Sequence, residues 1–194
     1  MAQLPTKVVT GPVRLSYAHL FEPYAQQEDQ TPKYSVQLLV PKTDKETIAK
    51  IEQAQKNALE NGKNKFPGGK IPKNWKNTFR DADEENNTDD PEEDDYKPEL
   101  KGMMFMTISS NTAPGVVDKY LRRITKEEGG EDIVYSGCYA RVSMNAAAFS
   151  VSGNNGVSFY VNNVMKVEDG ERLGGKSSAN DDFSAFAEDL DELL

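Results

Sequence analysis

The feature that most constrains the fold is a pair of long segments in which apolar and polar residues alternate. The range 138–151 alternates from Cys138 onward, and the range 157–167 has the same period of two. Successive side chains of a β-strand point to opposite faces, so each segment predicts a long strand with one buried face. The Gly-Asn-Asn-Gly sequence at 153–156 favours the positive φ angles of a tight turn. We therefore expect a long β-hairpin.

Three further segments, 13–21, 33–40 and 103–110, also predict strands. One helix is expected, with Asp44 as its N-cap, Gly62 at its end and a narrow apolar stripe that suits a surface position. Five strands, one peripheral helix and long loops predict a mainly β fold, an OB-fold-like five-stranded barrel that is partly open. A β-sandwich is the alternative.

The charge is distributed unevenly along the chain. The net charge is −9, but residues 81–99 carry −10 and residues 177–194 carry −6, so the remaining body is +7. Dense like charge without apolar residues predicts solvated segments. We therefore expect one folded domain over 1–176, interrupted by an acidic loop insertion at 81–99, followed by a disordered acidic tail over 177–194.

The residue inventory argues against an enzyme. His19 is the only histidine and Cys138 the only cysteine, so no Ser-His-Asp or Cys-His site can be assembled. His19 is expected to be an ordinary strand residue, and Cys138 a small core residue. The acidic run has oxygen ligands at EF-hand spacing from Asp81, but Asn86 stands where that loop requires glycine. We expect no metal and no cofactor.

The N-terminal residues show no signal peptide, and the longest apolar run, 103–106, is too short to span a bilayer. A single cysteine is typical of a reducing compartment. The expected location is the cytoplasm, and no membrane partner is expected.

The segment 63–80 interleaves cationic and aromatic side chains and contains no acid. A flexible single strand of DNA needs cations along its backbone and flat rings on which its bases stack. The sequence therefore predicts that this segment binds DNA through Lys63, Lys65, Lys70, Lys73, Trp75, Lys76, Phe79 and Arg80. The alternative is that Trp75 and Phe79 cap the core and the lysines only solubilise the loop.

Three strand residues extend this predicted DNA site. Tyr139 and Arg141 share the polar face of one strand, and Phe105 is a large ring on an otherwise Ser/Thr face. A phosphate contact from Arg141 and stacking on Tyr139 and Phe105 are one interpretation. Plain packing on a solvated sheet face is the other.

The acidic tail contains regularly spaced hydrophobic residues among its carboxylates. The predicted partner-binding residues are Asp181, Asp182, Phe183, Phe186, Leu190 and Leu193. Such a segment can fold as an amphipathic helix in a basic groove of a partner protein. Because it is tethered, it can also compete with DNA for the groove of its own chain. A tail that only solubilises the protein is the alternative.

Three blocks, at 135–142, 153–159 and 163–175, resemble a family of tailed-phage single-stranded DNA-binding proteins. The resemblance covers most of residues 8–175 and implies an OB-fold that coats single strands, with an acidic C-terminus that contacts replication proteins. The acidic run 84–95 departs from that family as an insertion, and the chain ends in two leucines instead of a terminal aromatic residue. The predicted helix also lies between the second and third strands, whereas the usual OB helix follows the third.

The sequence as a whole predicts a sequence-independent single-stranded DNA-binding protein that coats and protects DNA in phage replication and recombination, in the host cytoplasm. The alternative is an acidic interaction protein or DNA mimic that occupies another protein's basic site. A mimic needs carboxylates over its folded body, and here that body is positive.

Overall fold

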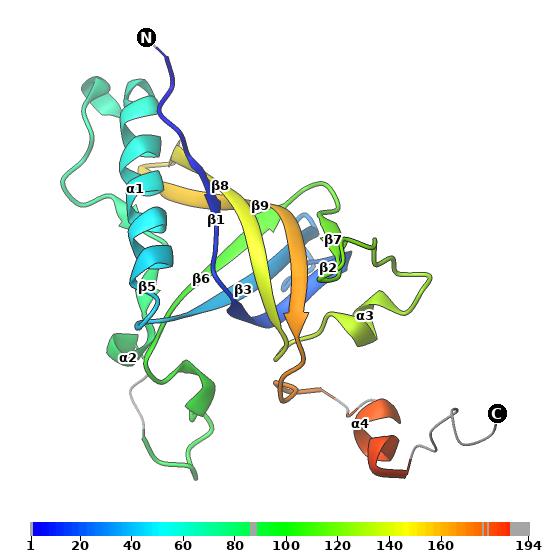
Figure 1. The fold of residues 1–194 in the computed structure, drawn as a ribbon. Coiled ribbons are helices and arrows are strands. Elements are labelled where there is room, and N and C mark those ends of the chain that lie inside the picture. The colour runs from blue at the N-terminus through cyan, green and yellow to red at the C-terminus, as the bar shows by residue number, and fades with distance from the viewer. Residues whose placement is uncertain (1, 86–88, 176, 178, 187–194) are drawn as a thin grey trace.

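The computed structural model describes residues 2–85, 89–175, 177 and 179–186. Its nine strands form one sheet (Figure 1): β1 (Lys7–Val9), β2 (Val13–Tyr24), β3 (Lys33–Pro41), β4 (Lys76–Asn77), β5 (Arg80–Asp81), β6 (Met103–Ser110), β7 (Gly115–Val117), β8 (Tyr139–Val151) and β9 (Asn154–Glu168). The α-helices are α1 (Lys45–Asn61), α2 (Ala82–Glu85), α3 (Gly130–Ile133) and α4 (Ala179–Phe183). Short 3-10 turns, η1 to η4, occupy Lys63–Lys65, Pro67–Gly69, Pro98–Leu100 and Ser184–Phe186. None of the described helices is long and apolar enough to cross a membrane.

The five long strands close into a ring. β8, β2, β3, β6 and β9 are neighbours in that order, and β8 pairs with β9 along nearly its whole length. The ring is weakest between β6 and β9, which meet in parallel at one pair, Ser109 and Tyr160. These are the five predicted strands, so the expected mainly β, OB-like, partly open barrel is confirmed, while the four short strands were not predicted.

The β8–β9 turn lies earlier than the sequence predicted. Val151 pairs with Asn154, so the two-residue turn is Ser152–Gly153, and both of these residues have positive φ. Asn154 to Gly156 were expected in the turn but extend β9 instead. A two-residue turn with positive φ at both positions matches the twist of the strands, which explains why it is used here.

Alternation fills the inside of the ring with apolar side chains. Leu15, Val36, Ile108, Val142 and Phe159 are among its buried residues. Cys138 is also buried and free, as expected of a small core residue, and burial raises the pKa of its thiol. The expected core faces of β3, β6 and β8 are therefore confirmed. In β9 the buried residues change parity from Val161 to Val164, so the expectation that Met165 and Val167 continue the core face is wrong, because a register shift in the β8–β9 pairing intervenes.

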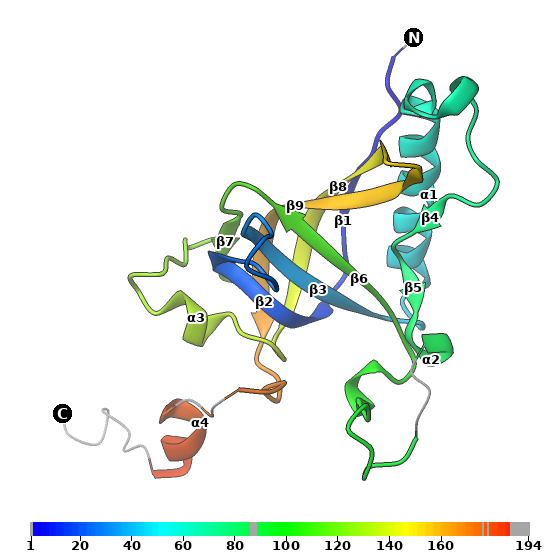
Figure 2. The ribbon, with the colours of Figure 1, turned by 180° about the vertical axis from the view of Figure 1, so that it is seen from behind.

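Helix α1 lies outside the ring, against β8 and β1 (Figure 2). The Asp44 carboxylate accepts a hydrogen bond from the Thr47 N–H at 3.1 Å, as an N-cap does. At the other end, a Cβ on Gly62 would lie 2.6 Å from the Cβ of Ala148, so only glycine allows this close approach to β8. Both predicted ends of the helix, and its place between the second and third long strands, are confirmed.

The acidic insertion is fastened to the barrel where it begins. Lys42 lies 2.6 Å from carboxylate oxygens of both Asp81 and Asp83, and the Gly102 N–H donates to Asp83 at 3.0 Å. The hydrogen bond from Lys42 holds the pKa of both carboxyls below the usual range. The first and last residues of the insertion are therefore held together next to β6.

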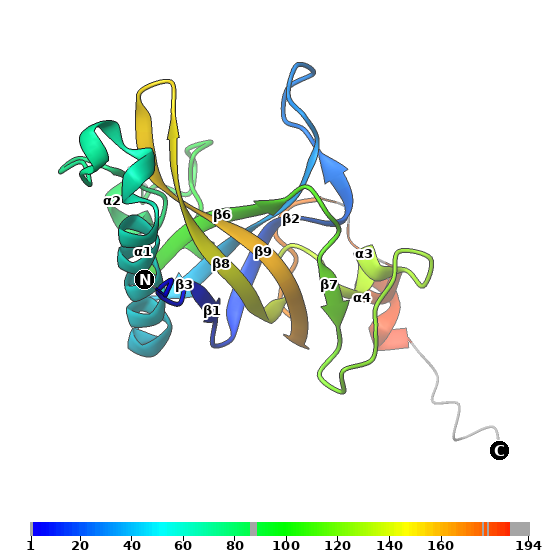
Figure 3. The same cartoon turned by 90° about the horizontal axis from the view of Figure 1, so that it is seen from above.

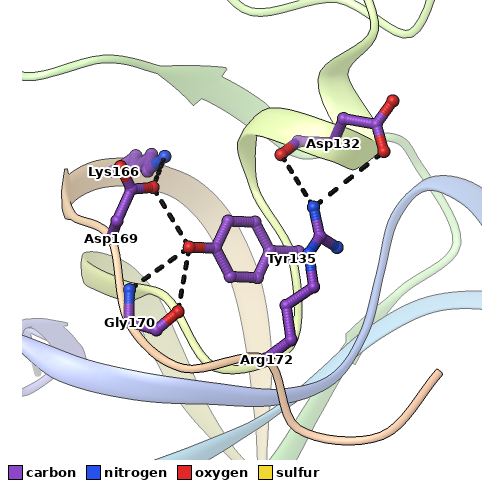
Figure 4. Close-up of polar contacts among 6 residues, drawn as sticks. All are labelled: Asp132, Tyr135, Lys166, Asp169, Gly170 and Arg172. Carbon is purple, nitrogen blue, oxygen red and sulfur yellow. Dashed lines mark hydrogen bonds and ion pairs between the residues drawn. The ribbon is translucent and has the colours of Figure 1, made fainter. Parts of the chain in front are cut away.

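The chain after β9 is pinned by a cluster around Tyr135 (Figure 4). The Tyr135 hydroxyl lies 3.1 Å from Asp169 Oδ1 and accepts a hydrogen bond from the Gly170 N–H at 3.2 Å. The Arg172 guanidinium lies 4.0 Å from the centre of the Tyr135 ring and donates to the carbonyl oxygen of Asp132. These contacts give a structural role to the sequence block at 163–175 on which the family resemblance depends most.

Candidate nucleic-acid interface

The outer surface of β2, β3 and β6, called the outer sheet face below, is polar but almost uncharged. Ser35 on β3 pairs with Ser109 on β6, and Gln37 pairs with Thr107. The pair that alternates with them, Val36 and Ile108, is buried in the core. In Figure 3 the β2–β3 and β8–β9 hairpins rise on the same side of the barrel, with β6 crossing between them. The outer sheet face therefore lies between two projecting hairpins.

Tyr17 is turned onto the outer sheet face by a bulge in β2. The pairing of β2 with β3 shifts register between Ser16 and His19, and Tyr17 has a φ of 46°, which is strained for a tyrosine. Its side chain is 58% exposed. β-Bulges commonly re-aim a side chain next to a functional site, so this strain marks Tyr17 as a candidate binding residue.

His19 and Tyr24 form a second aromatic element on the same face. Their rings are stacked, with centroids 4.2 Å apart and planes 9° apart, and Tyr24 is 51% exposed. Burial lowers the pKa of His19 from its ordinary value, against the opposing effect of Glu131, and so favours the neutral imidazole. Together with Tyr17, the pair lines an open cavity of about 910 Å³ whose other lining residues are Gln26, Gln30, Thr31, Lys33, Ser35, Thr107 and Ser109.

Arg80 and Phe105 meet at the other end of this face. β5 pairs with β6 so that Arg80 lies opposite Phe105, and the guanidinium is 4.7 Å from the ring centre. Phe105 is only 8% exposed and packs with Leu39 and Ala82. The prediction that bases stack directly on Phe105 is therefore wrong, because Arg80 and this small apolar cluster cover the ring. Arg80 itself is exposed beside the face.

Carboxylates of the acidic insertion surround this end. A cavity of about 300 Å³ is lined by Tyr17, Gln37, Arg80, Ala82, Leu100 and Phe105, by Lys97, and by Glu85, Glu93, Asp95 and Glu99. Arg80 Nη1 lies 2.9 Å from Glu85 Oε2. The cation at this end of the face is therefore already paired with a carboxylate of the same chain.

The aromatic residues of segment 63–80 belong mainly to the core. Phe79 is 2% exposed inside the main apolar cluster, so its predicted stacking on bases is wrong. Its N–H donates to Asn77 Oδ1 at 2.9 Å, which fixes the turn that carries the ring inward. Trp75 is half-buried against the same cluster, in agreement with the alternative that it caps the core.

The lysines of this segment lie along η1, η2 and β4. Two of them have local partners: Lys65 donates to the Ala148 carbonyl oxygen at 3.1 Å, and Lys63 lies 3.7 Å from Glu60. Lys70, Lys73 and Lys76 are exposed, and β4, which carries Lys76, pairs with β9 at Gly156 near the β8–β9 turn. Their contact with DNA stays a prediction.

Tyr139 and Arg141 are not brought together with Arg80. Both lie on β8, which is not a strand of the outer sheet face. Tyr139 has the Arg14 guanidinium 5.8 Å from its ring centre, and Arg141 Nη1 donates to the Thr10 carbonyl oxygen at 3.3 Å. These contacts agree with the packing alternative for Tyr139, while Arg141 is exposed elsewhere on the barrel.

The sequence did not identify Tyr17, His19 and Tyr24 as site residues, although a signal was present. Val13 and Leu15 are buried at odd positions, but the next core residue of β2 is Leu20, at an even position. In a regular strand, all residues on one face have positions of the same parity, so this change requires a bulge. A bulge within 16–19 turns Tyr17 to the outside.

The tail is described only to residue 186. Ala179–Phe183 form α4 and Ser184–Phe186 form η4, with Phe183 and Phe186 exposed. Leu190 and Leu193 lie outside the described residues, as does the side chain of Asp181, while Asp182 is exposed. Partner binding by these residues stays a prediction.

Comparison with known proteins identifies the family of this chain. The model of the family described as Enterobacter phage Enc34, ssDNA-binding protein matches residues 6–194. Protein p50 of Acyrthosiphon pisum secondary endosymbiont phage 1 is 28% identical over 200 residues, which cover 97% of this chain and 98% of p50.

Solved structures share the fold. The single-stranded DNA-binding protein of bacteriophage Enc34, in complex with ssDNA, superposes with a TM-score of 0.69 at 24% identity, over 87% of this chain and 90% of that one. Bacteriophage T7 gp2.5, a single-stranded DNA-binding protein, gives a TM-score of 0.58 at 14% identity over 96% and 97%. The resemblance inferred from the sequence is thus confirmed, and the family is one of binding proteins, not of enzymes: this chain belongs to the phage single-stranded DNA-binding protein family represented by that of Enterobacter phage Enc34.

Proposed function

We propose that this protein binds single-stranded DNA without sequence preference across its outer sheet face. The observation that carries the proposal is the row of exposed rings, Tyr17 and the stacked pair His19–Tyr24, on a face of uncharged polar residues. Every base has a flat face that can stack on such a ring, so stacking does not require a particular sequence. Arg80 and Lys33 stand at the two ends of the face, where they can neutralise phosphates.

The placement of charge on this face also sets the orientation of the bound strand. Uncharged Ser35, Gln37 and Thr107 can donate to and accept from base edges, whereas a phosphate needs a cation. Bases therefore face the sheet and the backbone faces the solvent. The solved complex of the related Enc34 protein with ssDNA supports binding of this class of ligand.

We assign the protein the role of coating and protecting single strands during phage DNA replication and recombination, in the cytoplasm of the host cell. The acidic tail is proposed to recruit replication or recombination proteins and to compete with DNA. The position of the chain before the tail supports competition: Leu173 and Gly174 line a cavity of about 540 Å³ together with Tyr17. A tail that starts here is tethered at high effective concentration beside the outer sheet face.

Fluorescence anisotropy with labelled oligonucleotides tests the proposal. The strands are one of mixed sequence, single-base homopolymers of the same length, and the corresponding duplex. We expect similar affinity for all the single strands, weaker binding of the duplex and a steep loss of affinity with added salt. A protein that binds neither single nor double strands would instead support the DNA-mimic alternative.

A further inference from the structure

The acidic insertion occupies the end of the outer sheet face at which Arg80 is placed. The described carboxylates involved are Glu85 on α2 and Glu93, Asp95 and Glu99 further along the insertion, and all four line one cavity with Tyr17 and Phe105. They are held there because Asp81, Asp83 and Gly102 tie the two ends of the insertion to β3 and β6. Their position is therefore a consequence of the fold.

Contacts between the insertion and the face use the groups that DNA would use. Glu85 takes the Arg80 guanidinium at 2.9 Å, which is the place of a phosphate oxygen. Lys97 Nζ lies 3.4 Å from the Tyr17 hydroxyl and 6.0 Å from the centre of the ring, so the insertion reaches the hydroxyl end of this side chain. Asp89 lies 3.6 Å from Lys101, which further reduces the positive charge next to β6.

We infer that these carboxylates act as an internal substitute for DNA phosphate, so that a single strand must displace Glu85 to use Arg80. The inference rests on the proposed function, since it concerns regulation of the same face. Exposed ion pairs of this kind are individually weak, so DNA can displace them. The result is a threshold: short or weakly bound strands are rejected at this end, and long strands that bind along the whole face are retained.

The insertion and the tail differ in how they are joined to the barrel. The tail is joined to the barrel at one end, whereas the insertion is joined at both ends beside the cavity it lines. The insertion therefore acts locally, at the Arg80 end alone. Its effect is expected to persist when residues 177–194 are deleted.

The test uses the full-length protein with the cavity carboxylates neutralised without a change of shape: Glu85→Gln, Glu93→Gln, Asp95→Asn and Glu99→Gln. A matched control removes the same charge from exposed glutamates elsewhere, Glu46→Gln, Glu52→Gln, Glu127→Gln and Glu128→Gln. Because charges beyond about 8 Å are largely screened at physiological salt, the control reports the effect of net charge alone. Thermal unfolding confirms that both variants are folded.

Anisotropy titration of a labelled single strand gives the readout. We expect the cavity variant to bind about fivefold tighter than wild type, and its log–log salt dependence to be steeper by about one, because Arg80 is then free to release a counterion from DNA. The control should change by less than about twofold. Equal changes in the two variants, or no tightening in the cavity variant, would overturn the inference while wild-type binding leaves the proposed function intact. Absence of binding in wild type would overturn both.

Discussion

The Arg80 guanidinium lies 4.7 Å from the centre of the Phe105 ring, which packs with Leu39 and Ala82. The two residues are far apart in sequence, and the pairing of β5 with β6 brings them together. A planar cation on an aromatic ring is held in one orientation and still has donors free for a phosphate. This pair places a cation at the edge of the outer sheet face.

Arg80→Ala is expected to weaken binding of single-stranded DNA by about three- to tenfold and to reduce the salt slope by about one, as the loss of one phosphate contact does. Anisotropy titrations at several salt concentrations measure both quantities. Lys50→Ala is a matched control, because Lys50 is an exposed cation paired with Glu46 on α1, away from the outer sheet face. An unchanged salt slope in Arg80→Ala would show that Arg80 does not contact phosphate.

Tyr17→Asn separates binding from folding. Asparagine tolerates the left-handed backbone that strains Tyr17 at φ 46°, so the melting temperature should not fall. Loss of a stacking ring is worth about 1–3 kcal/mol, so the affinity for single strands should fall at least fivefold. Tyr120→Ala is the control, because Tyr120 is 68% exposed on the loop after β7. Equal losses in both variants would contradict a specific role for Tyr17.

Deletion of residues 177–194 is expected to strengthen DNA binding severalfold, because a tethered anion no longer competes for the face. A second variant keeps the full length and replaces the six acidic residues of the tail with Asn or Gln. Electrostatic competition predicts tighter binding in both variants. Unchanged or weaker binding after the deletion would contradict competition by the tail.

Tyr135→Phe tests the cluster that pins the chain after β9. The variant keeps the ring beneath Arg172 but loses the hydroxyl contacts with Asp169 and Gly170. A buried hydrogen bond contributes about 1 kcal/mol, and a loss of that size lowers the melting temperature of a domain of this size by about 2–4 °C. Differential scanning calorimetry measures the change. DNA affinity should stay within twofold, since the hydroxyl that the variant removes is engaged by Asp169 and Gly170 and the ring is kept. A loss of affinity without a loss of stability would contradict this assignment.

The fold could be predicted because period-two alternation is a direct consequence of strand geometry, and the caps of α1 are local signals that Asp44 and Gly62 carry by themselves. The binding face could be predicted only in part. Composition alone pointed to segment 63–80 as a binding site. Phe79 is nevertheless a core residue, because burying its aromatic ring stabilises the fold more than leaving the ring exposed in a lysine-rich loop.

The arrangement of the site depends on strand pairing, of which the sequence shows only the change of parity in β2. Tyr17 reaches the surface through a bulge that breaks the alternation of β2, and Arg80 reaches Phe105 through the pairing of two segments far apart in sequence. The position of the acidic insertion beside the face likewise depends on Lys42, which lies between β3 and α1 and forms ion pairs with Asp81 and Asp83. Tertiary pairing, not residue type, decided each of these cases.

Photocrosslinking identifies the side chains that contact the bases of a bound strand, and so tests binding across the outer sheet face. A single strand that carries 5-iododeoxyuridine is irradiated with the full-length protein, and the modified residues are identified by mass spectrometry. Binding across this face predicts crosslinks to Tyr17, His19 and Tyr24, the rings on which bases would stack. Crosslinks confined to Tyr139 or Tyr120, with none on β2, would contradict binding across the outer sheet face.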